Sequence, residues 1–302
     1  MKINKAVFFG LKLLVSALSL YLVFLKSDIS QIISMLRKIG VAHFLTAALL
    51  YMVSICGATL RWKLLLPEKF RFRRLLSLYM IGSFFSSFLP GVIGGDVVKA
   101  YYLNKDAKKL GLTLGSVFMD RYLGYVSLMI IGMAAYPFAL PFFGESAYKW
   151  TMPVIFVAFV IGSILFFVLK LGRRFKTVSD FYEYFVLLKA RKDVITKAIV
   201  ISLGVQAMGL IAVAVLASAL GENIPVFLLF AFLPIIITIT TIPVSISGLG
   251  VREGAFVLLL GLIKIRPEAA TSLSLSWFFS TFVGSVPGLI AYIRQPGSAS
   301  KE

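Results

Sequence analysis

The chain has 302 residues, 59% of them hydrophobic, and a mean hydropathy of +0.94. Soluble domains average roughly 45–50% apolar residues, and here the excess forms runs that can cross a bilayer, so a soluble class is excluded. The formal net charge of +18 therefore indicates cytoplasmic loops and contact with anionic lipid head groups rather than with nucleic acid.

Apolar runs divide the chain, and about 20 residues are enough to span the hydrocarbon core. Six runs are unbroken and predict one transmembrane helix each, whereas the third and the seventh are interrupted by proline and glycine. The first run is interpreted as an uncleaved span, because it is too long for a signal peptide and no small-residue cleavage site follows it. The runs cover residues 6–25, 42–60, 75–98, 113–136, 151–169, 198–219, 226–263 and 270–293.

Lysine and arginine gather in three of the connecting loops. The positive-inside rule places residues 61–74, 99–111 and 170–197 on the cytoplasmic side. The outward loops 137–150 and 220–225 carry a single lysine between them. The segment between the first two spans must then also lie outside, although it is basic. Both chain termini are predicted to be cytoplasmic, with the protein in the cell (inner) membrane.

The same assignment predicts an inverted-topology repeat within one integral membrane domain, residues 1–302. Both ends of run 75–98 are inside, so this run is predicted to be a re-entrant hairpin. Both ends of run 226–263 are outside, and this run either forms a second hairpin or crosses as one long and one short helix. Residues 1–136 and 151–293 then each hold three spans and one broken hairpin, in opposite orientations. The predicted fold is an all-α polytopic membrane protein.

Two segments between the spans show apolar residues at helical spacing. Each predicts an amphipathic helix that either lies on the membrane surface or packs on the helix bundle. The first segment contains Ile29, Ile32, Ile33, Leu36 and Ile39, and the second contains Phe175, Val178, Phe181, Tyr182, Phe185 and Leu188.

The two interrupted runs contain similar breaks. Each break starts at a proline, Pro90 or Pro243, passes through small residues and a pair of glycines, and ends in charges at Lys99 or at Arg252 and Glu253. Backbone groups freed at membrane depth need protein or a water-filled cavity as partners. Because paired breaks in two halves mark the substrate site of many transporters, they predict where this protein binds its substrate.

Charged residues are scarce in the apolar runs and cluster near the breaks. A charge at the bilayer centre costs on the order of 2.5–3.5 kcal/mol on insertion scales, so it suggests a function. A helix that restarts near Asp96 would direct its positive end at a phosphate, and the fork of Arg252 suits the same ligand. The predicted substrate-binding residues are Gly94, Gly95, Asp96, Lys99, Asp120, Arg121, Ser245, Ser247, Gly248, Gly250, Arg252 and Glu253.

Each of these features has a structural alternative. Glycine and proline also serve packing in membrane helices, Asp120 and Arg121 can form an ion pair, and Lys99 can extend to the cytoplasmic interface. Arg61 is interpreted as an interfacial anchor, with a functional role as the alternative. Gln206 is interpreted as a helix–helix hydrogen bond.

The sequence lacks a constellation for covalent chemistry. It holds one cysteine, Cys56, and one histidine, His43, with no Ser/His/Asp set and no nucleotide-binding loop. One cysteine cannot form an intramolecular disulfide. The prediction is a protein that is not an enzyme and uses no cofactor or metal, so any transport is passive or ion-coupled.

Several motifs resemble one family. They are the Arg-Trp pair at 61–62, the segment at 89–101 that begins Leu-Pro-Gly-x-x-Gly-Gly-Asp, the Asp-Arg pair at 120–121 and the Ser-Gly-x-Gly-x-Arg-Glu segment at 247–253. Their order is similar to that in the flippase-like membrane domain of lysylphosphatidylglycerol synthases and its stand-alone relatives. The resemblance implies translocation of a lipid between leaflets. The chain ends at Glu302 without a soluble aminoacyltransferase domain, so lysyl transfer is not expected.

The sequence therefore predicts a flippase or scramblase for an anionic, phosphate-bearing lipid, either a phospholipid or a polyprenyl-linked one. The hairpin tips would meet near the midplane, where Lys99 and Arg252 attract phosphate while nearby carboxylates balance them. Two alternatives stay open: an ion-coupled permease for a small anionic solute and a non-transporting scaffold for lipid synthesis. The expected partners are anionic membrane lipids and enzymes of lipid or glycan synthesis.

Overall fold

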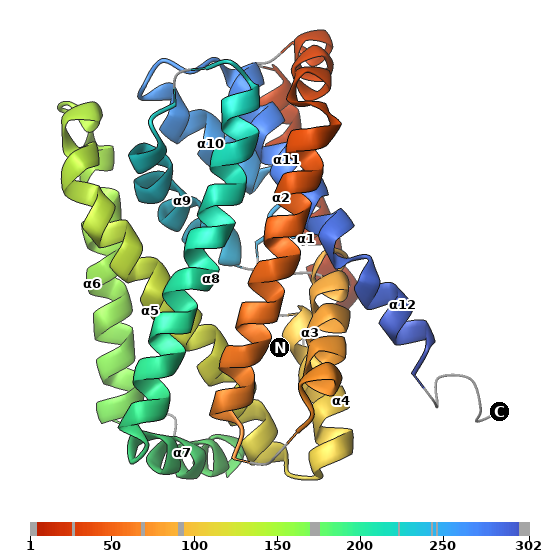
Figure 1. Ribbon diagram of the computed structural model, residues 1–302. Helices are drawn as coiled ribbons and strands as arrows, with labels where there is room; N and C mark the ends of the chain where they lie inside the picture. The colour runs from red at the N-terminus through yellow and green to blue at the C-terminus, as the bar shows by residue number, and fades with distance from the viewer. Residues whose placement is uncertain are drawn as a thin grey trace.

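The computed structural model describes residues 5–25, 28–67, 70–89, 94–169, 176–222, 224–242, 244–245 and 247–295. All regular structure in these ranges is helical (Figure 1). In chain order the helices are α1 (Lys5–Leu25), α2 (Ile29–Leu65), α3 (Phe72–Ser86), α4 (Gly94–Ala107), α5 (Leu110–Phe143), η1 (Ala147–Trp150), α6 (Thr151–Ser163), η2 (Ile164–Val168), α7 (Lys176–Lys189), α8 (Lys192–Ala219), α9 (Val226–Thr241), α10 (Val251–Gly261), α11 (Pro267–Ser285) and α12 (Pro287–Ile293).

The predicted all-α membrane architecture is confirmed. Five helical segments of the described chain are long and apolar enough to cross a bilayer: Ile29–Leu65, Leu110–Phe143, Ala147–Val168, Lys192–Ala219 and Pro267–Ile293. They match five of the six unbroken runs. The remaining run forms α1, whose apolar part Leu13–Leu25 is shorter.

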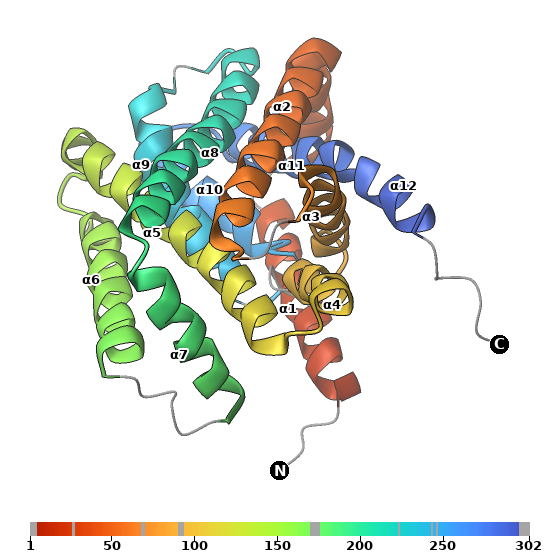
Figure 2. The same ribbon diagram turned by 60° about the horizontal axis from the view of Figure 1, so that its bottom comes forward.

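A large apolar core holds the bundle together. Helix α2 lies along α8 in both views (Figures 1 and 2), and α5 packs against α9. Phe232 of α9, Phe256 of α10 and Leu216 of α8 are fully buried in this core. Because every helix hides its own backbone hydrogen bonds, such a bundle is compatible with a surrounding hydrocarbon phase.

The described parts of the three basic loops gather at one end of the bundle, the lower end in Figure 1. The hydroxyl of Tyr184 on α7 donates to the carbonyl of Leu65 at the end of α2, at 2.8 Å. The ring of Tyr184 also packs on Gly115, near the start of α5. Arg74 on α3 pairs with Asp106 on α4 at 2.8 Å. This clustering is the arrangement that the positive-inside rule requires of loops on one side.

The less basic loops lie together at the opposite end of the bundle. Lys38 of α2 donates to the carbonyl of Leu220 at 2.9 Å, and Arg266 pairs with Glu222 at 3.0 Å. Helices α9 and α10 therefore both have their outer ends here, whereas α3 and α4 have theirs at the basic end (Figure 1). The two broken runs thus enter the bundle from opposite ends. That residues 1–136 and 151–293 form an inverted repeat stays a prediction.

The two amphipathic segments pack on the bundle. The first is the start of α2, which continues into the span through a kink at Gly40, where φ is +70°. Its Ile32 and Ile39 are 3% and 2% exposed. In the second segment, on α7, Tyr182 and Leu188 are also buried, whereas Phe175 lies outside the described residues. Ile29 and Ile33 of the first segment are exposed. Each segment therefore packs part of its apolar face on the bundle, and a position at the membrane surface stays open.

Candidate functional site

Five charged side chains from α2, α4 and α5 meet inside the bundle. The Nε of Arg61 lies 2.8 Å from Oδ1 of Asp120, and Nζ of Lys99 lies 3.0 Å from Oδ2 of the same carboxylate. Lys99 also lies 3.6 Å from Oδ1 of Asp96, and Asp96 pairs with Arg121. The chain thus places charges that are far apart in sequence in one connected network, which we call the charge cluster.

Uncharged groups complete the charge cluster. The hydroxyl of Tyr79 on α3 donates to Oδ2 of Asp120 at 3.0 Å, and Arg61 donates to the hydroxyl of Ser202 on α8 at 2.9 Å. The ammonium of Lys99 lies 4.1 Å from the ring centre of Tyr79 and 4.7 Å from that of Trp62. Buried charges need this kind of complete pairing, because an unpaired ion away from water is strongly unfavourable.

A cavity of 220 Å³ adjoins the charge cluster. Its wall is built by α2, α3, α4, α5, α8 and α9. Four of the charged side chains contribute to it: Arg61, Asp96, Asp120 and Arg121. The charge cluster contains three cations and two carboxylates, so one positive charge is uncompensated within it. A cavity with these walls can attract an anion. The lining residues are Ala58, Arg61, Tyr79, Asp96, Asp120, Arg121, Gly124, Tyr125, Leu128, Val205, Gln206, Ile237 and Thr241.

The glycines of the first break serve the packing of the hairpin. A Cβ on Gly95 would lie 1.9 Å from the carbonyl oxygen of Gly82 on α3, and one on Gly94 would lie 2.3 Å from Cβ of Leu89. A side chain on Gly95 would push α4 away from α3, and one on Gly94 would clash with Leu89, which follows α3. Residues 90–93 lie outside the described part of the chain. A direct contact between the two glycines and a ligand stays a prediction.

The charges of the second break form a closed pair. Arg252 donates to Oε1 of Glu253 at 2.7 Å and to the hydroxyl of Ser274 at 3.0 Å, and its guanidinium lies 4.8 Å from the ring of Phe278. The other oxygen of Glu253 accepts the backbone N–H of Gly250 at 2.6 Å. Glu253 therefore caps the start of α10 and neutralises Arg252 at the same time.

The loop before α10 is shaped for close packing. Ser247, Gly248 and Gly250 have positive φ angles of 50°, 76° and 81°. A Cβ on Gly250 would lie 2.5 Å from Cβ of Ser19 on α1, so glycine is needed there for both space and backbone conformation. Ser245 is buried, whereas Pro243 and Ile246 lie outside the described residues.

The loop before α10 contacts the end of α3. The hydroxyl of Ser247 lies 2.9 Å from the carbonyl oxygen of Ser86 and 3.0 Å from that of Ser87, at the end of α3. Carbonyl groups at the end of a helix have no partner in their own helix. The second hairpin therefore satisfies backbone groups of the first. The predicted meeting of the tips near the midplane includes residues 90–93, which lie outside the described residues, and it stays a prediction.

Comparison with known families agrees with this architecture. A family model described as the lysylphosphatidylglycerol synthase TM region matches residues 10–288. The chain belongs to this family. A search of curated proteins and a search of solved structures each gave no match. The family and the helical bundle fit a multi-pass membrane protein with a lipid-related function.

Several charged residues have partners other than those expected from the sequence. Arg61 is 4% exposed and belongs to the charge cluster, so its interpretation as an interfacial anchor is wrong. Lys99 is 3% exposed and does not extend to the interface. Asp120 pairs with Arg61 and Lys99, whereas Arg121 pairs with Asp96. Gln206 donates to the carbonyl of Gly124 at 2.8 Å, which confirms the predicted helix–helix hydrogen bond.

Sequence reasoning missed the neutral members of the charge cluster and of the Arg252 pair. Tyr79, Ser202 and Ser274 carry no charge and lie in ordinary apolar helices, so their sequence context gives no signal. Among the described residues, no group of three or more His, Cys, Asp or Glu side chains gathers to hold a metal ion.

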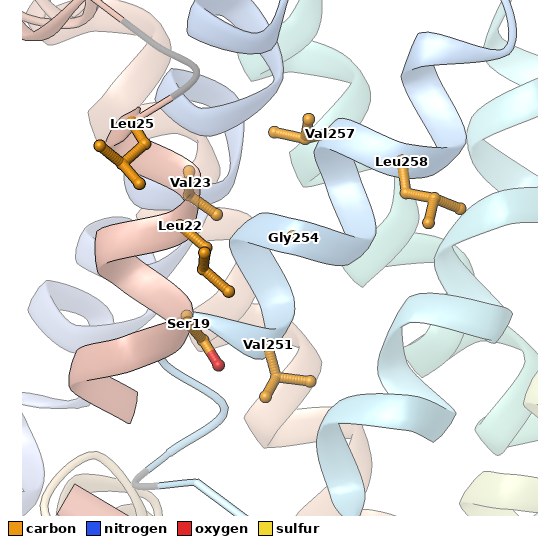
Figure 3. A pocket seen from close by; sticks show the side chains of 9 residues that line it. Ser19, Leu22, Val23, Leu25, Val251, Gly254, Val257 and Leu258 are labelled. Atoms are coloured by element: carbon orange, nitrogen blue, oxygen red, sulfur yellow. The ribbon is translucent and has the colours of Figure 1, made fainter. Parts of the chain in front are cut away.

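A separate apolar groove of 550 Å³ runs between α1 and α10. Figure 3 shows Leu22 and Val23 of α1 across from Gly254 of α10, with Val257 farther along the same helix. Ser19 supplies a polar side chain at one end. Its lining suits hydrocarbon rather than a charged group, so the cavity at the charge cluster is the better candidate for an anion.

Proposed function

We propose that this protein moves a lipid with an anionic, phosphate-bearing head group between the two leaflets of the membrane. The observation that carries the proposal is the cavity beside the charge cluster, which has one uncompensated positive charge. The lipid is a phospholipid or a polyprenyl-linked lipid. The protein is a transporter rather than an enzyme, in the cell membrane with both termini in the cytoplasm.

Physical chemistry explains why such a cavity favours head-group transfer. A phosphate that crosses the hydrocarbon core unaided loses its hydration, at a cost that is prohibitive for an ion. A preformed cluster of arginine and lysine replaces that hydration, and arginine offers phosphate a planar pair of donors. The acyl chains can stay in the bilayer meanwhile, so the protein has to accommodate only the polar part.

The small size of the cavity keeps a second function in consideration. Pockets for whole drug-sized ligands measure roughly 300–1,000 Å³, whereas this cavity has 220 Å³. A phosphate group fits either as part of a lipid or as a free anion, so an ion-coupled permease for a small anion is the second candidate. A non-transporting scaffold has less support, because a charged cavity inside a bundle is a poor feature for a purely structural protein.

Reconstitution in liposomes tests the proposal. Purified protein should speed the loss of leaflet asymmetry of a fluorescent phospholipid or a polyprenyl-phosphate lipid, compared with empty liposomes and without ATP. Arg121→Gln should abolish the gain, because Arg121 lines the cavity. Arg74→Gln is the matched control, because Arg74 pairs with Asp106 outside the cavity lining.

Two results would decide against the flippase. A broad lipid panel with no acceleration, with or without a proton gradient, together with uptake of labelled inorganic phosphate, would favour the permease. No movement of lipid or anion by protein that is folded and correctly inserted would favour the scaffold.

A further inference from the structure

The two carboxylates of the charge cluster are held very differently. Asp120 accepts hydrogen bonds from Arg61, Lys99 and Tyr79. The side chains of Arg61, Lys99 and Asp120 are only 4%, 3% and 2% exposed. All three donors converge on one buried group, so moving Arg61 or Lys99 would weaken the pairing of a buried charge. This part of the charge cluster is fixed.

The pair of Arg121 and Asp96 is looser. Their side chains are 30% and 19% exposed, and both line the cavity. Asp96 has a second cation within reach, because Lys99 lies 3.6 Å from its Oδ1. That separation is longer than the 3.0 Å between Lys99 and Asp120. Asp96 can therefore release Arg121 without losing every positive neighbour.

We propose that Arg121 is the side chain that binds the phosphate, and that Asp96 is an internal anion that occupies Arg121 until the phosphate displaces it. The inference rests on the proposed function and assigns roles within the same site. A carboxylate and a phosphate offer a guanidinium the same kind of paired oxygen acceptors. The exchange keeps Arg121 paired throughout, and a phosphodiester with one negative charge neutralises the surplus charge of the cluster.

The other arginines are poor alternatives for this role. Arg61 is committed to Asp120 and Ser202, and Arg252 is committed to Glu253 and Ser274. Of these three arginines, only Arg121 combines a place in the cavity wall with a partner that is itself partly exposed. The competition with Asp96 also gives the site a way to release its ligand, because the returning carboxylate replaces the phosphate.

A double-mutant cycle on ligand binding tests the exchange. The probe is dihexanoylphosphatidylglycerol, a water-soluble lipid with one phosphodiester charge, titrated calorimetrically into purified protein. Asp96→Asn removes the competitor and should lower the Kd, on the order of tenfold for a lost competition of about 1.4 kcal/mol. Arg121→Gln should raise the Kd by at least about tenfold on the same scale.

The double variant separates displacement from simple charge attraction. If Asp96 competes for Arg121, the combined Asp96→Asn and Arg121→Gln variant binds as weakly as Arg121→Gln alone. If removal of Asp96 only makes the cavity more positive, the gain in affinity persists in the double variant, and the displacement idea is wrong. Asp106→Asn, at the exposed pair with Arg74, is the control and should leave the Kd unchanged.

Two further results keep the inference open to refutation. Arg121→Lys retains a cation opposite Asp96 but loses the planar pair of donors, so it should weaken binding of the probe. This test does not depend on whether Asp96→Asn folds. Unchanged binding by a folded Arg121→Lys variant would overturn the role of Arg121. Wild-type protein that transports lipid while Asp96→Asn binds more weakly would refute only the exchange. Wild-type protein that neither binds the probe nor transports lipid would refute the proposed function itself.

Discussion

The breaks in the two helix pairs have similar sequences but different charge balances. After the first break, Asp96 and Lys99 join a network that spans three helices and adjoins a cavity. After the second break, Arg252 and Glu253 pair with each other and with Ser274, and they are 9% and 0% exposed on their side chains. The first network has a surplus charge, whereas the second pair is neutral.

This difference shows that a charge next to a glycine-rich break has two distinct uses. In the second hairpin, the carboxylate caps the start of α10 and holds the arginine, so the pair stabilises the turn. In the first hairpin, the partners of the charges come from other helices, so the network depends on the assembled bundle. Glycine has the same role in both places, because it lets neighbouring backbones approach closely.

The largest expected effect follows from removing the centre of the charge cluster. Asp120→Asn leaves the buried cations Arg61 and Lys99 without their shared carboxylate. Breaking a buried ion pair costs about 3–5 kcal/mol, and here two cations lose the carboxylate that lies nearest to them. We expect a large fall in the free energy of unfolding, measured as the thermal midpoint in detergent.

Asp106→Asn provides the matched control for this comparison. Its partner Arg74 is 35% exposed, and exposed ion pairs contribute only about 0–1 kcal/mol. Equal losses of stability in Asp120→Asn and Asp106→Asn would show that the charge cluster is not the structural centre that its burial indicates.

A substitution in the second hairpin should lower the stability of the protein but leave its transport rate unchanged. Glu253→Gln leaves Arg252 buried with Ser274 and Phe278 as its remaining neighbours. We expect a loss of about 3 kcal/mol, the lower end of the range for a broken buried pair. Protein that remains folded should still move lipid at the wild-type rate in liposomes, unlike Arg121→Gln.

The contrast between these variants can also fail in an informative way. If Glu253→Gln abolishes transport at unchanged thermal stability, the second break belongs to the transport site after all. If Arg121→Gln loses as much stability as Glu253→Gln, the charges near both breaks contribute equally to the stability of the fold.

Much of the fold could be predicted because its signals are local. Runs such as 113–136 and 198–219 appear as α5 and α8, since a span needs only length and apolar composition. Proline and glycine correctly divided the third and seventh runs into helix pairs. The start of α2 was harder, because segment 29–39 continues through Gly40 into the span with a local kink rather than a break.

The site was predictable in composition but not in pairing. Charges in apolar runs are rare, so Asp96, Lys99 and Asp120 stand out in the sequence. Their partners depend on how distant helices pack: Arg61 meets Asp120 across 59 positions and Ser202 across 141. Adjacent residues were misleading as well, because Asp120 and Arg121 belong to different ion pairs. The different pairing of the charges at the two breaks is visible only in the three-dimensional structure.

The smallest expected effect concerns the contact between the hairpins. Ser247→Ala removes the hydroxyl that lies between the carbonyl groups of Ser86 and Ser87. A typical hydrogen bond contributes about 0.5–1.5 kcal/mol, and a buried acceptor left unpaired costs about 1–3 kcal/mol. Because a helix end retains some access to other partners, we expect a loss of about 1 kcal/mol, seen as a modest fall in the thermal midpoint.

Comparison with Ser247→Gly separates the hydrogen bond from the backbone conformation. Ser247 has a φ of 50°, a region that favours glycine, so Ser247→Gly loses the hydroxyl but relieves the strained backbone and should be less destabilised than Ser247→Ala. Ser218→Ala is the control, because that exposed hydroxyl bonds only within α8 among the contacts described for it. A loss in Ser247→Ala no greater than in this control would mean that the hairpin tips are held together by packing alone, and the two breaks would then be independent units.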